Sequence, residues 1–417
     1  MKKKFKVSMT AIITLSMVLG VAFGLIAGRN FPLVEMLGQL FLRLIQMSII
    51  LLVTGQIIEA VGGIKPAETG KIGVKTVVIF AVSTLLASVF GVVMALIFKP
   101  GFGVSLSNIE AGTQAAQAQS NSLADTLLGF FPTNIIQAMS NGVIVQAIVF
   151  AIFFGFGLSL VNKDGNSQLY QIVVEFNKII MRIINMVMKT APIGVFCLVA
   201  SSIGKFGIEV IIPLANYLGV FALATVIFLT IWVVTVSLYT HVKIIDIVNG
   251  VTRMSLVALA TTSSAVTLPI EMEDAEKKLG VTKAVNKITL PLGVSLNSNG
   301  AAMHIAITIL TVAQLYGVQF DFSNLLYIVI LAGFASMANA VVPGAGLVSL
   351  SIVIPQMGLP LEAIALFAGV EWFVGMLRTI TNVDADTFTS MLVAKSENLL
   401  NYDVYKKDYQ PVVNETA

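Results

Sequence analysis

The stretch Asn297-Ser298-Asn299-Gly300 interrupts a long apolar run that extends from residue 283 to residue 315. A break inside an apolar helix is tolerated at membrane depth when it is buried in protein or lines a cavity. Just upstream, two apolar arms flank Ser263-Ser264, and the charged run 271–278 follows. We expect each arm to have about 10–15 residues, which as helix is too short for a hydrocarbon core of about 30 Å. This region therefore predicts a hairpin that enters and leaves on one side, followed by a broken helix.

The same order of elements recurs towards the C-terminus. Two apolar arms within 322–358 flank Ala338-Asn339-Ala340-Val341-Val342-Pro343-Gly344-Ala345-Gly346, and a long helix with polar residues follows at 361–395. Neither flank of this second hairpin carries Lys or Arg, so we expect it to open outward, opposite to the first. Two such units of opposite orientation are typical of an inverted-repeat transporter with its binding site near the middle of the membrane.

The composition agrees with a membrane protein. The chain has 417 residues, 57% of them hydrophobic and 11% charged, with a mean hydropathy of +0.92. A soluble domain carries roughly 25% charged residues, so these values exclude a soluble globular protein, a disordered chain and a nucleic-acid binder. The single cysteine, Cys197, cannot form an internal disulfide.

The remaining apolar runs predict further spans and an orientation. The first run, 7–27, follows four lysines and has about 20 residues, so we interpret it as a transmembrane helix and not a signal peptide. Further runs lie at 33–62, 72–98, 127–161, 168–203 and 208–241. Lys65, Lys71, Lys75 and Lys163 fall on the side of the N-terminus, whereas the alternate loops carry little charge. The positive-inside rule then predicts a cytoplasmic N-terminus.

Four ionisable residues lie within the helix at 361–395, namely Glu371, Arg378, Asp384 and Asp386. Each costs roughly 3 kcal/mol at the bilayer centre, so a function is the default interpretation. On a helical wheel an arc of about 80° contains most of them. That arc includes Glu371, Gly375, Arg378, Asn382 and Asp386, whereas Asp384 points elsewhere. The face is predicted to bind substrate and ions; the alternative is a structural ion pair between Arg378 and Glu371.

The chemistry of these residues suggests separate roles. The planar guanidinium of Arg378 suits a carboxylate, and an anionic substrate would neutralise an otherwise costly unpaired charge. Asn382 and Asp386 offer oxygens that, with carbonyls of broken helices, could hold a hard monovalent cation. Asn297 and Asn299 either add oxygens to such a site or cap the broken helix.

Two further features remain open at this level. Ser263 and Ser264 at the tip of the first hairpin could donate to a carboxylate, beside the positive end of the helix that starts there. His304, one turn past Gly300, is either a proton carrier or a packing residue. The repeated spacing of Gly20, Gly24 and Gly28 predicts close helix packing.

Several stretches resemble one known family. They are Leu40-Phe41-Leu42-Arg43-Leu44-Ile45, Ala191-Pro192-Ile193-Gly194-Val195-Phe196, Thr267-Leu268-Pro269, Pro291-Leu292-Gly293, Val342-Pro343-Gly344-Ala345-Gly346 and Arg378-Thr379. Together they make the chain, over roughly 35–395, similar to the dicarboxylate/amino acid:cation symporters, which include glutamate and C4-dicarboxylate transporters. The resemblance implies an all-α polytopic membrane protein of the glutamate-transporter-homologue fold. It has eight transmembrane helices and two re-entrant helical hairpins, arranged as inverted repeats.

The resemblance also implies roles for individual positions. Substrate would be held at Ser263, Ser264, Val342, Gly346, Gly375, Arg378, Thr379 and Asn382. Sodium ions would be held at Gly293, Asn297, Asn382 and Asp386, with a further site at Ser83, Thr84 and Asn299. The family further implies a homotrimer and an elevator-like motion in which the second hairpin closes the outer side.

Four positions depart from the family pattern. Asn299 replaces an acidic sodium ligand, and Gly375 replaces the aspartate that usually holds the amino group of the substrate. Ala301 replaces a threonine near the distal carboxylate, and Thr262 replaces an arginine found in some members. These departures predict fewer coupled sodium ions and weak selection for an α-amino group.

We divide the chain accordingly into scaffold and transport segments. These are 1–70 (scaffold, first two helices), 71–125 (third helix of the transport domain, and outer loop), 126–207 (scaffold, fourth and fifth helices), 208–395 (sixth helix, both hairpins, broken seventh helix and eighth helix of the transport domain) and 396–417 (cytoplasmic tail). The predicted protein is a multi-pass cell-membrane symporter, surrounded by lipid, with both termini in the cytoplasm.

The predicted activity is symport of a small anionic substrate, a dicarboxylate or an acidic amino acid, with sodium ions or protons and no other cofactor. One alternative is a carrier of neutral amino acids in which Arg378 pairs with Glu371. Another is a channel-like or sensory protein that binds its ligand without accumulating it. An enzyme is not expected, because the sequence shows no nucleophile–base pair or metal-ligand cluster.

Overall fold

A computed structural model describes residues 9–28, 31–63, 66–102, 128–162, 167–207, 211–337 and 345–406, and over these ranges the chain is almost entirely helical. Apart from an isolated bridge between Val281 and Leu400, the described ranges contain no β-structure. The helices are α1 (Met9–Ala27), α2 (Pro32–Gly62), α3 (Pro66–Phe98), α5 (Ile135–Ser140), α6 (Ile144–Val161), α7 (Gln168–Met188), α8 (Ala191–Phe206), α9 (Ile211–Thr240), α10 (Ile244–Thr261), α11 (Ser264–Lys277), α12 (Lys283–Leu296), α13 (Asn299–Leu315), α14 (Phe322–Met337), α15 (Ala345–Gln356), α16 (Ala363–Ala368) and α17 (Glu371–Ser396), with a final 3₁₀ turn, η2 (Tyr402–Tyr405).

The long helices expose apolar side chains on their outer faces. Leu86, Val226 and Leu238 are each more than half exposed, which a soluble monomer avoids over so wide a surface. Among the described residues, four segments are long and apolar enough to cross a membrane by length and composition, or five if the bent pair of α7 and α8 is one span. They are Gly70–Phe98, Ile211–Thr240, Ile244–Thr261 and Lys283–Leu315. These helix lengths therefore do not establish the predicted total of eight transmembrane helices.

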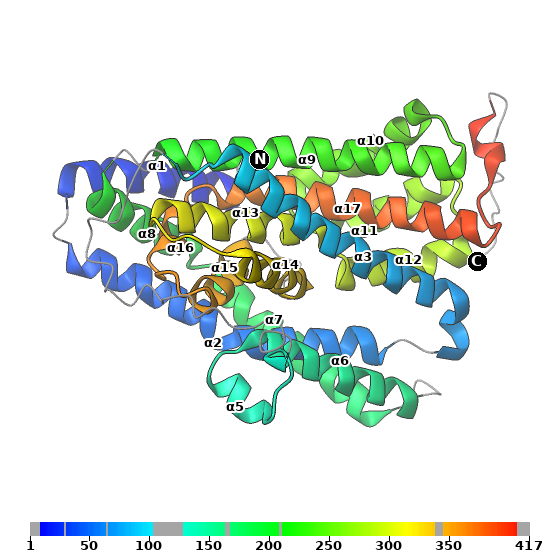
Figure 1. The fold of residues 1–417 in the computed structure, drawn as a ribbon, viewed down its shortest axis with the longest axis horizontal. Helices are drawn as coiled ribbons and strands as arrows, with labels where there is room; N and C mark the ends of the chain where they lie inside the picture. The colour runs from blue at the N-terminus through cyan, green and yellow to red at the C-terminus, as the bar shows by residue number, and fades with distance from the viewer. Residues whose placement is uncertain are drawn as a thin grey trace, which may run out of the picture.

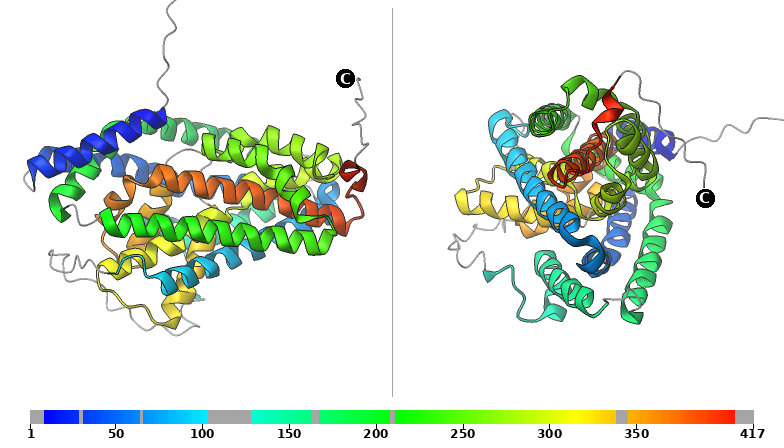
Figure 2. Two further views of the ribbon diagram at one scale, coloured as in Figure 1. Left: turned by 90° about the horizontal axis from the view of Figure 1, so that it is seen from above. Right: turned by 90° about the vertical axis from the view of Figure 1, so that its right-hand side faces the viewer.

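The helices form two packed groups, and most run along the long axis of the molecule (Figure 1, Figure 2). One group contains α1, α2, α6, α7 and α8, which pack on one another. The other contains α3 and α9 to α17, with α17 running through its centre between α9 and α3 (Figure 1). The segment that combines α12 and α13 is buried along its whole apolar window, so the second group encloses the polar break at Asn297.

The first hairpin consists of α10 and α11, and ion pairs fix its two arms side by side. Arg253 of α10 contacts Glu273 at 2.6 Å and Asp274 at 2.9 Å, both on α11, so the arms are antiparallel about a turn near residue 263. Hydrogen bonds from Lys277 and from Arg253 lower the pKa of the exposed Glu273 to about 2. The expected length of 10–15 residues was wrong for α10, which has 18, because its apolar pattern continues to Thr261.

The second hairpin consists of α14 and α15. The phenol of Tyr327 donates to the amide oxygen of Gln356 at 3.5 Å, so these arms are also antiparallel. The connecting residues 338–344, which include Val342, lie outside the described residues. Gly346 is buried in the first turn of α15.

Two of the predicted single helices are each divided into two helices. The run 168–203 is divided into α7 and α8, which meet at an angle of 58°. Pro192 lies in the first turn of α8 and cannot donate a backbone hydrogen bond to the preceding turn, so the helix ends before it. The run 361–395 is likewise divided, because α16 ends at Ala368 and α17 begins at Glu371.

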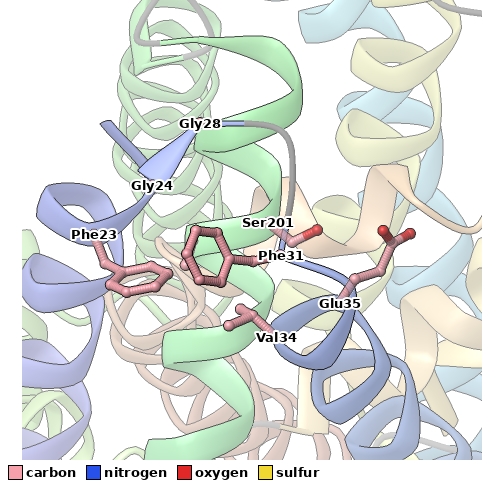
Figure 3. Close-up of a pocket in the computed structure, with 8 residues that line it drawn as sticks. Phe23, Gly24, Gly28, Phe31, Val34, Glu35 and Ser201 are labelled. Carbon is pink, nitrogen blue, oxygen red and sulfur yellow. The ribbon is translucent and has the colours of Figure 1, made fainter. Parts of the chain in front are cut away.

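The glycine spacing in α1 serves helix packing at Gly20 and Gly24, as predicted, but a Cβ on Gly28 would meet nothing within 4 Å. A Cβ on Gly20 would lie 2.9 Å from the carbonyl oxygen of Phe196, and one on Gly24 would lie 2.7 Å from that of Ala200. Only a glycine leaves room for the backbone of α8 at these positions. Figure 3 shows this seam, where a cavity of about 10 Å³ is lined by Phe23, Gly24, Gly28, Phe31, Val34, Glu35, Ala200 and Ser201.

Candidate functional site

The break between α12 and α13 lies directly against α17. The backbone N–H of Gly300, in the first turn of α13, donates to the side-chain oxygen of Asn382 at 2.8 Å. A Cβ on Gly300 would collide with the backbone of Arg378, so only glycine permits this approach. Because α13 begins here, Asn382 caps one of its otherwise unsatisfied N–H groups. The break and the polar face of α17 therefore form one site.

A carboxylate with an unsatisfied oxygen lies beside this break. Asn297 donates to Oδ1 of Asp386 at 2.6 Å, while Oδ2 of Asp386 has no hydrogen-bond partner among the described residues. Asp386 is fully buried, and a Cβ on Gly293 would collide with its carboxylate. The last carbonyls of α12 also point towards the break, since a helix end leaves them without partners. An orphaned carboxylate oxygen next to carbonyls fits a hard cation such as sodium.

A second polar cluster joins α13 to α3. Ser83 donates to the side-chain oxygen of Asn299 at 3.2 Å, and Thr84 donates to the same oxygen at 3.1 Å. Thr84 also lies 3.4 Å from the side-chain oxygen of Asn297. The Nδ2 atom of Asn299 has no partner among the described residues. The structure thus brings together the residues predicted for a further sodium site, but an amide replaces the charge.

Arg378 has a protein partner. Its Nη1 lies 3.1 Å from Oε1 of Glu371, and both side chains are almost completely buried. The same oxygen accepts the backbone N–H of Gly346 at 2.9 Å. The structure therefore shows the ion pair that the sequence left open as the alternative, and Arg378 is not unpaired. The two residues are seven positions apart, or about two helical turns, and so share one face of α17.

The tip of the first hairpin faces Arg378. Thr262 has a left-handed backbone, with φ +50°, and its hydroxyl has no partner among the described residues. A Cβ on Gly375 would lie 3.7 Å from Nη2 of Arg378 and 3.8 Å from Cβ of Thr262, which is ordinary contact. The side-chain oxygen of Ser263 caps α11 by accepting the N–H of Val266 at 3.4 Å. The hairpin tip, Gly375 and the guanidinium therefore meet in one place.

The other predicted substrate residues occupy different surroundings. Ser264 is buried at the start of α11. The hydroxyl of Thr379 donates to the carbonyl of Gly375 within α17 at 2.7 Å, so it is bonded to its own helix. Ala301 is fully buried in α13.

Sequence reasoning missed two buried contacts that hold the first hairpin to α17. Glu271 of α11 is fully buried and accepts the hydroxyl of Thr387 at 3.0 Å. Asp384 accepts the hydroxyl of Ser255 at 2.6 Å, which explains why it points away from Arg378. If residues 264–277 are taken as a helix, Glu271 lies on the same face as Thr267 and Asp274. That face is buried in the structure, so helical spacing is the sequence signal for a buried Glu271.

His304 takes part in a buried polar contact. Its Nδ1 lies 2.5 Å from the hydroxyl of Tyr217 and 3.2 Å from that of Thr308, while Nε2 has no partner among the described residues. The ring also packs against Phe221. The geometry therefore agrees with a packing residue that carries one hydrogen-bonded nitrogen.

The buried charges do not balance. Besides Asp274, which pairs with Arg253 and Lys278, four buried carboxylates lie on α11 and α17, those of Glu271, Glu371, Asp384 and Asp386. Among the described residues, Arg378 is the only cation that bonds to any of them. Buried unpaired charges are costly, so the remaining negative charge favours binding of cations or protons. In the described part of the chain, no three His, Cys, Asp or Glu side chains form a group that could hold a metal ion.

Comparisons with known proteins identify the family of the chain. The chain matches the sodium:dicarboxylate symporter family over residues 9–396. It is 31% identical over 409 residues to a proton/sodium-glutamate symport protein of Bacillus subtilis (strain 168), covering 96% of this chain and 95% of that protein. It is 29% identical to a proton/glutamate-aspartate symporter of Escherichia coli (strain K12), covering 95% of this chain and 94% of that protein. It is 28% identical to a C4-dicarboxylate transport protein of Laribacter hongkongensis (strain HLHK9), covering 94% of this chain and 90% of that protein.

Proposed function

The chain belongs to the sodium:dicarboxylate symporter family, and from this premise we propose that it imports a small dicarboxylate or an acidic amino acid. The protein is a membrane symporter and not an enzyme, since the family and its relatives are transporters. Sodium ions or protons drive the uptake. The observation that carries the choice of substrate is the buried guanidinium of Arg378 between the hairpin tip at Thr262 and the second hairpin at Gly346.

Substrate is held between the two hairpins and α17. One carboxylate binds Arg378, whose planar fork of donors matches it. The other end of the substrate lies near Ser263, Ser264 and the hydroxyl of Thr262. Asn382 and Thr379 complete the described part of the pocket; Val342, which the family resemblance adds, lies outside the described residues.

Uptake into proteoliposomes tests this function. A panel of succinate, fumarate, malate, aspartate, glutamate and neutral amino acids is applied under separately imposed sodium and proton gradients. Accumulation of an acidic substrate above its outside concentration supports the proposal. Mere equilibration indicates a channel, and binding without uptake indicates a sensor.

A carrier of neutral amino acids is the second candidate, favoured by the ion pair between Arg378 and Glu371 at 3.1 Å. This pair leaves no net charge at that end of the site, so a substrate with a single carboxylate could bind without disturbing it. Concentrative uptake of serine, threonine or alanine, with no competition by succinate or aspartate, would favour this candidate over the first.

Gly375 determines how strongly the site selects substrates that carry an amino group. An ammonium at membrane depth needs an anionic or multiply accepting partner, and glycine supplies none. We expect succinate, fumarate or malate to compete at least as well as aspartate. Replacement of Gly375 by aspartate should raise the preference for aspartate over succinate by roughly 10-fold or more, the value of one charge-assisted hydrogen bond.

Competition assays measure that ratio, and Gly375→Asn is the matched control. A Cβ at this position meets no backbone, so both variants should fold. An unchanged ratio in Gly375→Asp would contradict the role given to this position, as would wild-type uptake of aspartate that no C4-dicarboxylate inhibits.

Sodium is held at two places with different strengths. Asp386, Asn297, Gly293 and Asn382 form the stronger site, because it contains a carboxylate. Ser83, Thr84 and Asn299 form a weaker one, since the oxygen of Asn299 carries no charge and already accepts two hydroxyl groups.

The number of coupled sodium ions should therefore be lower than in family members with an acidic residue at position 299. Reversal-potential measurements on proteoliposomes give this number. Asn299→Asp restores the charge and should raise the sodium number by one, whereas Asn299→Gln should not. An equal number in the wild type and in Asn299→Asp would refute the assignment.

An elevator motion carries the substrate across the membrane. We assign the group of α1, α2, α6, α7 and α8 to the scaffold (1–70 and 126–207) and the group of α3 and α9 to α17 to the transport domain (71–125 and 208–395), with 396–417 as a tail; the packing within each group supports this assignment. An apolar cavity of about 260 Å³ lies at the seam between α1, α8, α9, α16 and α17, and a loosely packed apolar seam offers little resistance to sliding.

The scaffold forms a homotrimer. Glu175, Lys178 and Arg182 are exposed on α7, near the middle of a helix that faces the membrane in an isolated chain. Charges cannot face lipid at that depth without a large cost, so neighbouring copies cover them.

Both termini lie in the cytoplasm, supported by the distribution of lysines. Lys71, Lys243, Lys277, Lys278, Lys283 and Lys287 are exposed near the open end of the first hairpin. The C-terminal segment lies at the same end, where Lys75 pairs with Glu397 and Tyr402 bonds the carbonyl of Thr240. An excess of lysine marks the cytoplasmic side.

A further inference from the structure

Glu371 holds the two donors that a substrate carboxylate needs. Its Oε1 accepts the N–H of Gly346 at 2.9 Å and the guanidinium of Arg378 at 3.1 Å. Gly346 lies in the first turn of α15, which is an arm of the second hairpin, whereas Arg378 lies on α17. One protein carboxylate therefore occupies the position that a carboxylate of the substrate would take.

We propose that a substrate carboxylate displaces Glu371 from Arg378 and Gly346, and that the displaced Glu371 takes up one proton. The inference rests on the proposed function, because it requires a substrate with a carboxylate for Arg378. The charges balance on both sides of the exchange. Before it, Arg378 and Glu371 sum to zero; after it, Arg378, the substrate carboxylate and the neutral acid sum to zero. The proton comes from the aqueous side that the site faces.

The burial of Glu371 makes protonation the favourable outcome. Its side chain is only 7% exposed, and its second oxygen, Oε2, has no hydrogen-bond partner among the described residues. Once Oε1 also loses Arg378, an ionised carboxylate would be a buried charge with no partner among the described residues. Such a charge costs several kcal/mol, and a buried group of this kind binds a proton instead.

Among the described residues, the neighbouring ionisable groups offer Glu371 no second cation. From α9 and α13, the groups nearest this end of α17 are Tyr217 and His304, which bond to each other. The described residues of α15 include none that ionise. The lysines of α3 and α12 lie at the opposite end of α17, where Lys75 contacts Ser396 and Thr282 bonds Leu399. The charged residues of α10 and α11 lie at that same end of α17 or near Thr387; they are Asp246, Arg253, Glu271, Glu273, Asp274, Glu276 and Lys277. Glu362, which precedes α16, is exposed.

Proton uptake then accompanies the binding of every substrate that places a carboxylate on Arg378. A substrate with one carboxylate can leave the ion pair in place and bind without a proton. The exchange also releases Gly346 from Glu371 when substrate arrives, so the second hairpin changes its partner in the same step.

Calorimetry of succinate binding to the purified full-length protein tests the exchange. Titrations in saturating sodium, in two buffers with different heats of ionisation, count the protons taken up per succinate. They are repeated from pH 6.5 to 8.5, where succinate is already the dianion. We expect about one proton per succinate, and an apparent Kd that rises by up to about tenfold per pH unit.

Three variants separate the role of Glu371 from mere structural support. Glu371→Gln, which resembles the protonated acid, should bind succinate with no proton uptake and with a Kd independent of pH. Glu371→Asp should restore proton uptake. Glu362→Gln removes an exposed acid nine positions earlier and should behave as the wild type.

The outcomes distinguish the inference from the proposed function. Succinate binding by the wild type without proton uptake overturns the inference and leaves the proposed function intact. Unchanged proton uptake in Glu371→Gln, or loss of succinate binding in a folded Glu371→Gln, also overturns it. If the wild type binds no dicarboxylate or acidic amino acid, the proposed function fails and the inference falls with it. If Glu371→Gln does not fold, the proton count of the wild type decides alone.

Discussion

Replacement of Arg378 by alanine is expected to abolish uptake of dicarboxylates. Among the described residues, the guanidinium is the only cation that bonds to the buried carboxylates of Glu271, Glu371, Asp384 and Asp386, and alanine removes its whole fork of donors. Loss of a charge-assisted pair is worth about 2–3 kcal/mol, or roughly 30–150-fold in affinity. Uptake of radiolabelled succinate into proteoliposomes, with binding measured by calorimetry, gives the size of the loss.

The ion pair with Glu371 requires a control for folding. Removal of one partner of a buried pair leaves the other charge alone and can cost about 3–5 kcal/mol of stability. The double variant Arg378→Ala/Glu371→Gln removes both charges, so it should recover stability but not succinate affinity. Arg378→Lys keeps the charge without the planar fork and should give an intermediate affinity. Wild-type affinity for a dianion in the folded double variant would disprove that Arg378 binds the carboxylate.

Replacement of Asp386 by asparagine is expected to remove the sodium dependence of uptake. Oδ2 of Asp386 has no hydrogen-bond partner among the described residues, and an amide offers the cation one neutral oxygen in place of a carboxylate. Loss of one charged ligand of this kind should raise the half-saturating sodium concentration by roughly 30-fold or more, from about 2–3 kcal/mol. Sodium titrations of succinate binding and of uptake measure the change.

Asp384→Asn is the matched control on the same helix. Asp384 is equally buried, but its carboxylate bonds to Ser255 of the first hairpin and faces away from the break at Asn297. It should alter stability more than sodium affinity. An equal shift in sodium affinity for both variants would indicate a general effect of buried charge and not a site at Asp386.

The sequence alone predicted most of the helical layout because the signals are local. Apolar run lengths mark the helices, and the short arms around Ser263 predict a hairpin without knowledge of its neighbours. The Asn-Gly break at 297–300 appears in the structure between α12 and α13. Helical periodicity placed Glu371, Arg378, Asn382 and Asp386 on one face of α17. The ion pair between Arg378 and Glu371 at 3.1 Å agrees with this placement.

The family resemblance, carried by several short motifs, is confirmed over residues 9–396. The resemblance predicted Ser83 and Thr84 as partners of Asn299 in a sodium site, although they lie more than 200 positions from it. Hydrophobicity and periodicity contain no information about that contact, because it forms only when α3 packs against α13.

Only the tertiary structure decided which partner each buried charge has. The sequence left Arg378 either unpaired or bonded to Glu371, and it gave no partner for Glu271 or Asp384. Their partners, Thr387 and Ser255, lie 116 and 129 positions away. A hydrogen bond over such a separation depends on how whole helices pack, and that packing results from many apolar contacts spread along the chain. The sequence by itself therefore determined where polar groups enter the membrane, whereas the packing of α11, α13, α15 and α17 determined how each of them is satisfied.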